Sequence, residues 1–457
     1  MNNRAALPNL RVRLCQFGLD VKREHDRECG VIITLVAVFM LFVIGAMAAL
    51  SIDVVTLYTA RSEAQLAADA GALAGARALA NSGITSDPRR RWMSSATTLA
   101  TAVATHVASQ NVVGGRALNS SVASGEITVT FPNQNDDTDP KVTVQVRRTD
   151  LPTFFARIWG STQITVAASA TAEAYNSSGA AYQPGGTGTT IPVAPICVKP
   201  WLLPNLDPTG GPGTQIFDTF SGAIMGNRRN SLVGEGWGQG QRNRSGLSAA
   251  CEDCSRSIPG PTAGQYYPGA IGSDAGDFPA PAQGSPSCGA GFNAYQLAVA
   301  GCVQQPISCG ATINIDTTTT YAATRNTDTA AAASCLIHAN GAAGDSDSID
   351  PAYPLPPFQF IAGNQNPIPN VAGKDVLVSD SLVTIPVINA TTVAPTSSVQ
   401  IIGFIQGFLN PSGDAIPANN QIPVTIINLA GCGTSATGQQ PILGNGASPV
   451  AVRLITP

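Results

Sequence analysis

Charged side chains are scarce in this sequence. Asp, Glu, Lys and Arg make up 12% of its 457 residues, about half of the typical ~25%, and the formal net charge is −4. A chain with so little positive charge has no broad basic surface, so we expect no nucleic-acid partner. With only 3 histidines, the chain is also poorly equipped for acid–base catalysis.

Motifs for catalysis and for cofactor binding are missing as well. The sequence contains neither Gly-x-Ser-x-Gly nor His-Glu-x-x-His, and the alternating glycines of residues 234–240 lack the Lys-Ser/Thr ending of a phosphate loop. The acidic loop at 132–140 lacks the ligand spacing of a calcium loop. We therefore expect no catalytic, cofactor-binding or metal-binding residues, no cofactor and no small-molecule substrate.

What the sequence does contain is one long apolar stretch. Residues 31–52 carry no charge, and the first charged residue after them is Asp53. As a helix these 22 residues would be about 33 Å long, enough to cross a hydrocarbon core of ~30 Å. We expect a transmembrane helix here, with the lipid bilayer as a partner.

Small residues dominate the continuation of this helix to about residue 80. Alanines recur every four residues and therefore share one helix face: Ala60, Ala64, Ala68, Ala72 and Ala76. Such a stripe lets a partner helix, or the chain's own domain, approach closely. Alternatively, alanine is there only because it is the best helix former.

A family resemblance rests on this region and on two later segments. The residues that carry it are Gly30, the apolar run, Asp53, Tyr58, Arg61, the segment QLAADAGALAGA at 65–76, LPTFFARIWG at 151–160 and QITVAASATAEAY at 163–175. Over about residues 28–175 the chain resembles TadE/TadG-like proteins of the Flp (Tad) pilus, in their larger TadG-like branch. The resemblance implies a long helix packed on a small pilin-like antiparallel sheet, and a role in pilus assembly. It also implies contact with the pilus machinery or pilin-like proteins, which we assign to the alanine stripe.

The residues around the apolar run predict its orientation. Residues 1–29 contain six Lys and Arg, which the positive-inside rule keeps in the cytoplasm. We expect a single-pass protein of a bacterial cell membrane, with its bulk periplasmic or extracellular. Two alternatives involve cleavage: Ala46-Met47-Ala48 resembles a signal-peptidase site, and Gly30 resembles a prepilin site. Leu35 stands where a prepilin has Glu, which argues against prepilin processing.

Composition and local patterns, together with what the resemblance implies, divide the chain into five parts and predict an α+β fold with a long N-terminal helix, a small pilin-like antiparallel sheet and a disulfide-containing β-rich C-terminal domain. The parts are a cytoplasmic tail (1–29), the transmembrane and stalk helix (30–80), a small α+β module (81–175), a Gly- and Ser-rich linker (176–190) and a β-rich domain (191–457). In the module, 93–108 has a helical pattern and 126–131, 141–148 and 163–175 read as strands. In the last part, 374–388, 398–409 and 421–429 are rich in β-branched residues.

Eight of the ten cysteines follow residue 190, on the side expected outside the cytoplasm. Their even number predicts disulfides in an oxidising compartment. The pair in Cys251-Glu252-Asp253-Cys254 also has the spacing of a redox or zinc site, and Cys335 with His338 is a weak second zinc signal.

Taken together, these features favour a membrane-anchored, non-enzymatic component of Flp/Tad-type pilus assembly. It would act through helix packing and an exported interaction domain. Two alternatives use the C-terminal β domain: a surface adhesin, and a secreted or anchored hydrolase in which His338 is a candidate base.

Overall fold

The computed structural model describes residues 25–87, 92–132, 139–160, 162–177, 193–210, 213–225, 232–238, 246–271, 291–317, 324–417, 419–432, 442–443 and 448–456. The chain divides into two compact units: Met1–Thr59 with Thr149–Ile164, and Ala60–Arg148 with Thr165–Pro457. A long N-terminal helix is followed by a region that is rich in β-sheet and contains disulfides. The predicted α+β fold is thereby confirmed.

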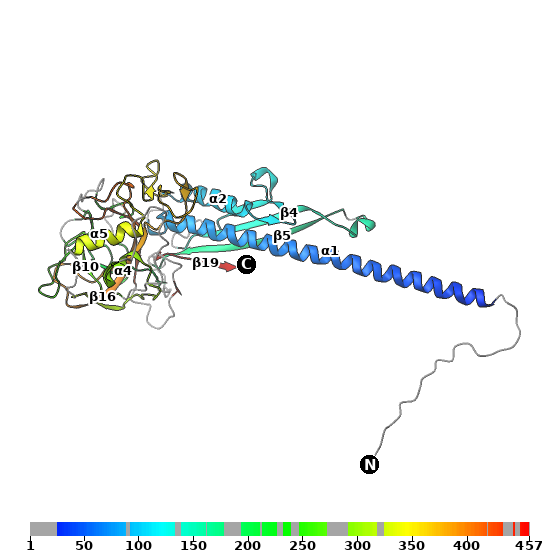
Figure 1. Ribbon diagram of the computed structural model, residues 1–457, viewed down its shortest axis with the longest axis horizontal. Helices are drawn as coiled ribbons and strands as arrows, with labels where there is room; N and C mark the ends of the chain where they lie inside the picture. The colour runs from blue at the N-terminus through cyan, green and yellow to red at the C-terminus, as the bar shows by residue number, and fades with distance from the viewer. Residues whose placement is uncertain are drawn as a thin grey trace, which may run out of the picture. The chain divides into compact units, whose positions relative to one another are not determined.

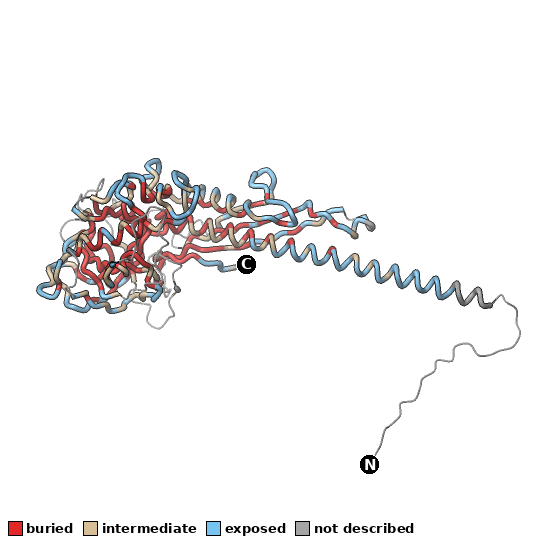
Figure 2. Tube along the Cα trace, in the orientation of Figure 1, coloured by how far each residue is buried: buried red, intermediate tan, exposed pale blue. Residues whose placement is uncertain are grey.

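Helix α1 (His25–Asn81) runs for 57 residues without interruption (Figure 1). Its apolar half is exposed: Leu41 and Phe42 are 73% and 71% accessible, and only 6% of the most apolar 18-residue window is buried (Figure 2). The core helix of a soluble protein would instead be covered on its apolar face. By length and composition, α1 is the one candidate membrane span among the residues that the structure describes.

The second piece of the first unit is the end of a β-hairpin. Strand β4 (Lys141–Pro152) leads into a single 3₁₀ turn, η3 (Ala156–Trp159), and Gly160 closes this turn in the left-handed region with φ 89° before β5 (Gln163–Tyr175) begins. Pro152 is therefore the last residue of β4 and does not open the turn, whereas Gly160 ends it.

In the larger unit, a small sheet contains the strands predicted for the α+β module. Its order is β19-β5-β4-β3, with β3 at Ile127–Thr130 antiparallel to β4. Along β4 the side chains of Val142, Val144 and Val146 are buried in alternation, which confirms the period-two prediction. Between α1 and β3 lie η1 (Ile84–Ser86), α2 (Met93–Ser109), β1 (Val112–Val113), β2 (Arg116–Ala117) and η2 (Val122–Ser124).

The edge strand of this sheet comes from the other end of the chain. Strand β19 (Ala451–Thr456) pairs antiparallel with β5, with Ala451 opposite Tyr175 (Figure 1). An ion pair between Arg453 and Glu173 joins the same two strands. The last strand of the sequence therefore completes the sheet of the module that the sequence places at 81–175.

Most buried strands belong to a second, larger sheet. Its central strands are β15 (Leu382–Ile388), β16 (Ser398–Leu409) and β17 (Val424–Gly431), which are antiparallel and almost wholly buried. They correspond to the three β-rich segments predicted near the C-terminus. The sheet order is β8-β17-β16-β15-β7-β10-β9, and β11 pairs with β16. Its other strands are β7 (Trp201–Pro204), β8 (Gly236–Trp237), β9 (Ser248–Ala249), β10 (Gln265–Pro268) and β11 (Thr312–Asn314).

Two short helices, α4 (Ala294–Ala300) and α5 (Arg325–Leu336), contribute side chains to the same core cluster as β7, β15, β16 and β17. Smaller sheets surround this core. They consist of β12 (Ser348–Ile349), β13 (Phe360–Ile361) and β14 (Asp375–Val376), and of β6 (Val193–Ala194) with β18 (Ile442–Leu443).

A buried polar network joins the end of α1 to the large sheet. The Asn428 amide nitrogen donates to the Ala80 carbonyl at 2.5 Å and to the Gln406 side chain at 2.6 Å, while its amide oxygen faces the hydroxyls of Thr85 and Ser86. Because every group is buried and partnered, this network specifies one arrangement of η1 on β16 and β17.

Candidate functional site

The alanine stripe of α1 is buried inside the chain's own larger unit. Ala64, Ala68, Ala72 and Ala76 have no accessible surface, and Ala60 is 3% exposed. A Cβ placed on the neighbouring Gly71 would lie 3.1 Å from both the Ala104 carbonyl oxygen and the Ala108 Cβ. Assigning the contact with the pilus machinery to this stripe is therefore wrong, because these alanines are already covered by the chain itself. The other expectation, packing against the chain's own domain, is confirmed.

Helix α2 supplies the complementary small face. Its buried residues are Ala96, Ala100, Ala104 and Ala108, again four apart. Two helices with small facing residues approach closely, as small-xxx-small pairs do. The sequence predicts the helix correctly, but its larger apolar residues occupy a different face.

That other face of α2 borders an apolar groove of about 640 Å³. Leu99, Val103 and Val107 line the groove from α2, and Phe358 and Phe360 line it from the β13 region. His106 is exposed and also lines the groove.

Asp53 makes the most specific contact in the smaller unit. Its carboxylate accepts hydrogen bonds from three consecutive backbone N–H groups, those of Phe154 at 2.9 Å, Phe155 at 3.0 Å and Ala156 at 2.7 Å. These amides open the turn η3, where free N–H groups need an acceptor and where negative charge is favoured. Only 4% of Asp53 is exposed. The carboxylate therefore clamps the hairpin tip to α1, one residue beyond the apolar run.

The sequence identifies Asp53 as the first charge after the apolar run and as part of the family resemblance, but not as the acceptor of this clamp. The acceptor and its donors are about a hundred residues apart. Backbone N–H groups also have no side-chain signature, so no local pattern could have revealed the pairing.

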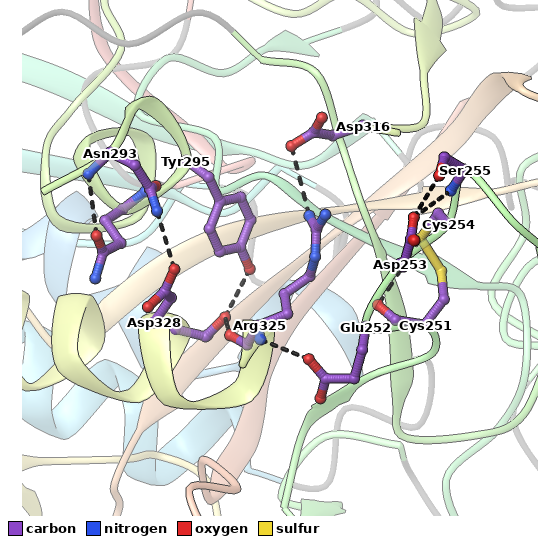
Figure 3. Close-up of polar contacts among 12 residues, drawn as sticks. Cys251, Glu252, Asp253, Cys254, Ser255, Asn293, Tyr295, Asp316, Arg325 and Asp328 are labelled. Carbon is purple, nitrogen blue, oxygen red and sulfur yellow. Dashed lines mark hydrogen bonds and ion pairs between the residues drawn. A yellow bond between two sulfur atoms is a disulfide. The ribbon is translucent and has the colours of Figure 1, made fainter. Parts of the chain in front are cut away.

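In the larger unit, the Cys251–Cys254 pair is a formed disulfide beside a buried arginine (Figure 3). Between the two cysteines, Glu252 reaches the start of α5. Its carboxylate accepts from the backbone N–H of Arg325 at 2.5 Å and from the side-chain amide of Asn326 at 3.1 Å. The short loop thus supplies an acidic cap to a helix N-terminus.

The Arg325 side chain lies fully buried between this cap and an aromatic cluster. Its guanidinium is 3.5 Å from the Asp316 carboxylate and 5.2 Å from the centroid of the Tyr295 ring. Burial raises the pKa of the Tyr295 phenol, so this hydroxyl stays protonated and donates to Tyr266 at 3.2 Å. These contacts pair the buried cation with an acid and an aromatic ring of its own chain.

The other predicted disulfides include two long-range bonds. Cys197 pairs with Cys302 and Cys309 with Cys432, and Cys335 is also disulfide-bonded. The prediction of disulfides is thereby confirmed. Because Cys335 is oxidised, it is not a free thiolate that could bind zinc together with His338.

His338, the candidate base of the hydrolase alternative, pairs with an acid. Its Nε2 lies 2.8 Å from the Asp380 carboxylate, and its backbone has a positive φ of 59°.

In the same domain, burial lowers the pKa of Lys199 to about 7, and the charge of Asp380 partly opposes this. The Lys199 ammonium donates to the Gly301 carbonyl at 2.6 Å.

Two further carboxylates of the larger unit accept hydrogen bonds from their own chain. Asp345 accepts from the backbone N–H groups of Asn340 and Ala342, and Asp347 accepts from Ser379 and Gly363. Within the described ranges, no group of three or more His, Cys, Asp and Glu could hold a metal ion. Residues 133–138 of the acidic loop lie outside the described residues.

These observations define a class: an α+β protein whose N-terminal helix carries one segment apolar enough to span a membrane and then packs, through small residues, into its own domain. Residues 30–78, which lie within α1, match the family model described as "Putative Flp pilus-assembly TadE/G-like". The match confirms the resemblance over those residues, and for residues 79–175 it stays a prediction. No curated protein and no solved structure matches the chain.

Proposed function

We propose that the protein is a single-pass, membrane-anchored component of Flp/Tad-type pilus assembly that works by interaction and not by catalysis. The observation that carries this proposal is that the family match at 30–78 falls on a single helix whose two halves differ in exposure. Its first half exposes large apolar side chains, and its second half buries an alanine stripe. An exposed apolar helix is stable in lipid and costly in water.

The orientation proposed is cytoplasmic for the N-terminus and periplasmic or extracellular for the domains after α1. Two features support it. The Lys and Arg residues before the apolar run favour retention of this end in the cytoplasm, and the disulfides after the run suit an oxidising compartment.

The contact with the pilus machinery is assigned to the exported domains, since the alanine stripe is covered. A non-enzymatic role is supported by three acidic residues of the larger unit. Glu252, Asp345 and Asp347 all bind groups of their own chain, so these residues serve the fold.

A complementation experiment tests the proposal. In a strain without the chromosomal gene, the wild-type protein should restore pili and should resist extraction from membranes by alkaline carbonate. Leu41→Arg combined with Val38→Arg places two charges in the exposed apolar run and costs roughly 2.5–3.5 kcal/mol per residue at the centre of a span. This variant should be extracted and should fail to restore pili.

The matched control is Val393→Arg, which introduces the same charge at a residue that is 76% exposed in the C-terminal domain. It should behave as the wild type. Full piliation of the deletion strain, or recovery of the wild-type protein in the soluble fraction, would contradict the proposal.

A further inference from the structure

We infer that the β4–β5 hairpin tip, residues 151–157, is a second membrane contact that rests in the headgroup region of the leaflet from which α1 emerges. The ligand is a phospholipid surface. The inference rests on the proposed function, since it needs α1 to span the membrane. It assigns a lipid-binding role to a segment that lies about a hundred residues after the span.

The position of the tip follows from the Asp53 clamp. Residues 31–52 carry no charge, so Asp53 is the first charged residue of α1 after the apolar run, and it is expected at the level of the headgroups where the span ends. Its carboxylate holds the backbone N–H groups of Phe154, Phe155 and Ala156 at 2.7–3.0 Å. The tip is therefore fixed at the same depth as the end of the span, within the same compact unit.

The side chains of the tip suit that depth. Phe154 is 61% exposed, although its neighbours Leu151 and Thr153 are buried. The tip is thus well packed at its base and still presents a large aromatic ring outward. Arg157, also exposed, lies on the same turn, and Tyr58 of α1 is 71% exposed. Aromatic rings and cations together are typical of the membrane–water interface, where rings enter the acyl boundary and arginine pairs with phosphate.

A lipid surface fits these features better than a protein partner does, because the clamp holds the exposed ring beside the end of a helix segment whose apolar side chains already require lipid. A protein partner at the same place would have to enter the headgroup layer beside α1. The experiment below separates the two, because lipid adducts and protein adducts are different products.

Photo-crosslinking of the full-length protein tests the inference. Benzoylphenylalanine replaces Phe154, and because this side chain is exposed the added benzoyl group can project outward without disturbing the fold. The protein is reconstituted into phosphatidylethanolamine–phosphatidylglycerol vesicles that contain an alkyne-tagged phosphatidylethanolamine. After irradiation, tagged lipid on the protein is measured. The same probe at Val122, which is 92% exposed in η2, is the matched control, and the probe at Leu41 reports on the span itself.

The probe at 154 should yield at least about tenfold more lipid adduct than the probe at 122, because only residue 154 is held by the Asp53 clamp beside the end of the span. Adding Asp53→Ala should lower the adduct at 154 by at least about threefold, since the tip loses its clamp. Two results would overturn the inference and leave the proposed function intact. In the first, the probe at 41 forms lipid adduct but the probe at 154 forms no more than the control at 122. In the second, the probe at 154 forms protein adduct instead of lipid adduct. Absence of adduct at 41 would instead overturn the proposed membrane span, and the inference with it.

Discussion

Replacing Gly75 with leucine tests whether the small-residue face of α1 is an internal surface. A Cβ at this position would lie 3.0 Å from the Val142 Cγ1, 3.2 Å from the Ala104 Cβ and 3.4 Å from the Ala100 carbonyl oxygen. Two of these neighbours belong to α2 and one to β4, so a leucine must push the elements apart. Overpacking of this kind costs about 3 kcal/mol, and the better helix propensity of leucine returns about 0.8 kcal/mol. We expect a net loss of about 2 kcal/mol in the free energy of unfolding.

The same helix offers a matched control. A Cβ at Gly45 would meet nothing within 4 Å, so Gly45→Leu changes the same residue type without a clash. Urea unfolding of the full-length protein in detergent micelles, followed by the fluorescence of the buried Trp201 and Trp237, measures both variants. With a slope near ~3 kcal/mol per molar urea, the midpoint of Gly75→Leu should fall by about 0.7 M and that of Gly45→Leu should not fall.

A specific result would refute this reasoning. If Gly75→Leu unfolded at the wild-type midpoint and nevertheless lost pilus proteins on purification, the face would contact a partner and not α2. A loss of stability without any change at Gly45 supports the internal packing described above.

Three further predictions concern the larger unit. Asn428→Leu should lower the free energy of unfolding by roughly 3–5 kcal/mol, because several buried groups lose partners; Asn389→Leu, at an exposed residue, should be nearly neutral. Burial lowers the pKa of Lys199 to about 7. Between about pH 7 and ~10.4 the unfolded state therefore binds one more proton than the folded state, and the free energy of unfolding rises with pH by at most about 1.4 kcal/mol per pH unit. Lys199→Met should remove this slope from denaturation curves measured across that range. Replacing Cys309 and Cys432 by serine opens a loop with a sequence separation of 123 and should cost about 2–5 kcal/mol, and an unchanged thermal midpoint would contradict that role.

Local patterns predicted much of the secondary structure. Alternation identified β3 and β4, and β-branched residues identified β15, β16 and β17. These predictions succeed because the period of the side chains along one element repeats within a few residues. The helical pattern of α2 was read from Leu99, Val103 and Val107 in the same way.

Which face of α2 is buried could not be predicted in that manner. Hydrophobicity favours the face with Leu99 and Val103, but the structure buries Ala100 and Ala104 completely. Close approach of two helices selects small residues over large apolar ones, and the choice depends on what the opposing helix presents. Similarly, the redox and zinc alternatives for Cys251 were open in the sequence, because the spacing of two cysteines does not reveal their bonding.

The linear order of residues by itself determined that an uncharged segment long enough for a bilayer precedes an alanine-rich continuation, and that strands and cysteines follow. Those properties depend on composition and on short periods along the chain. Only the tertiary structure decided that the alanine stripe is buried within the chain, that strand β19 returns to β5, and that Asp53 holds the hairpin tip. Each of these contacts joins residues far apart in the chain, and their partners are backbone groups or small side chains that leave no periodic signal.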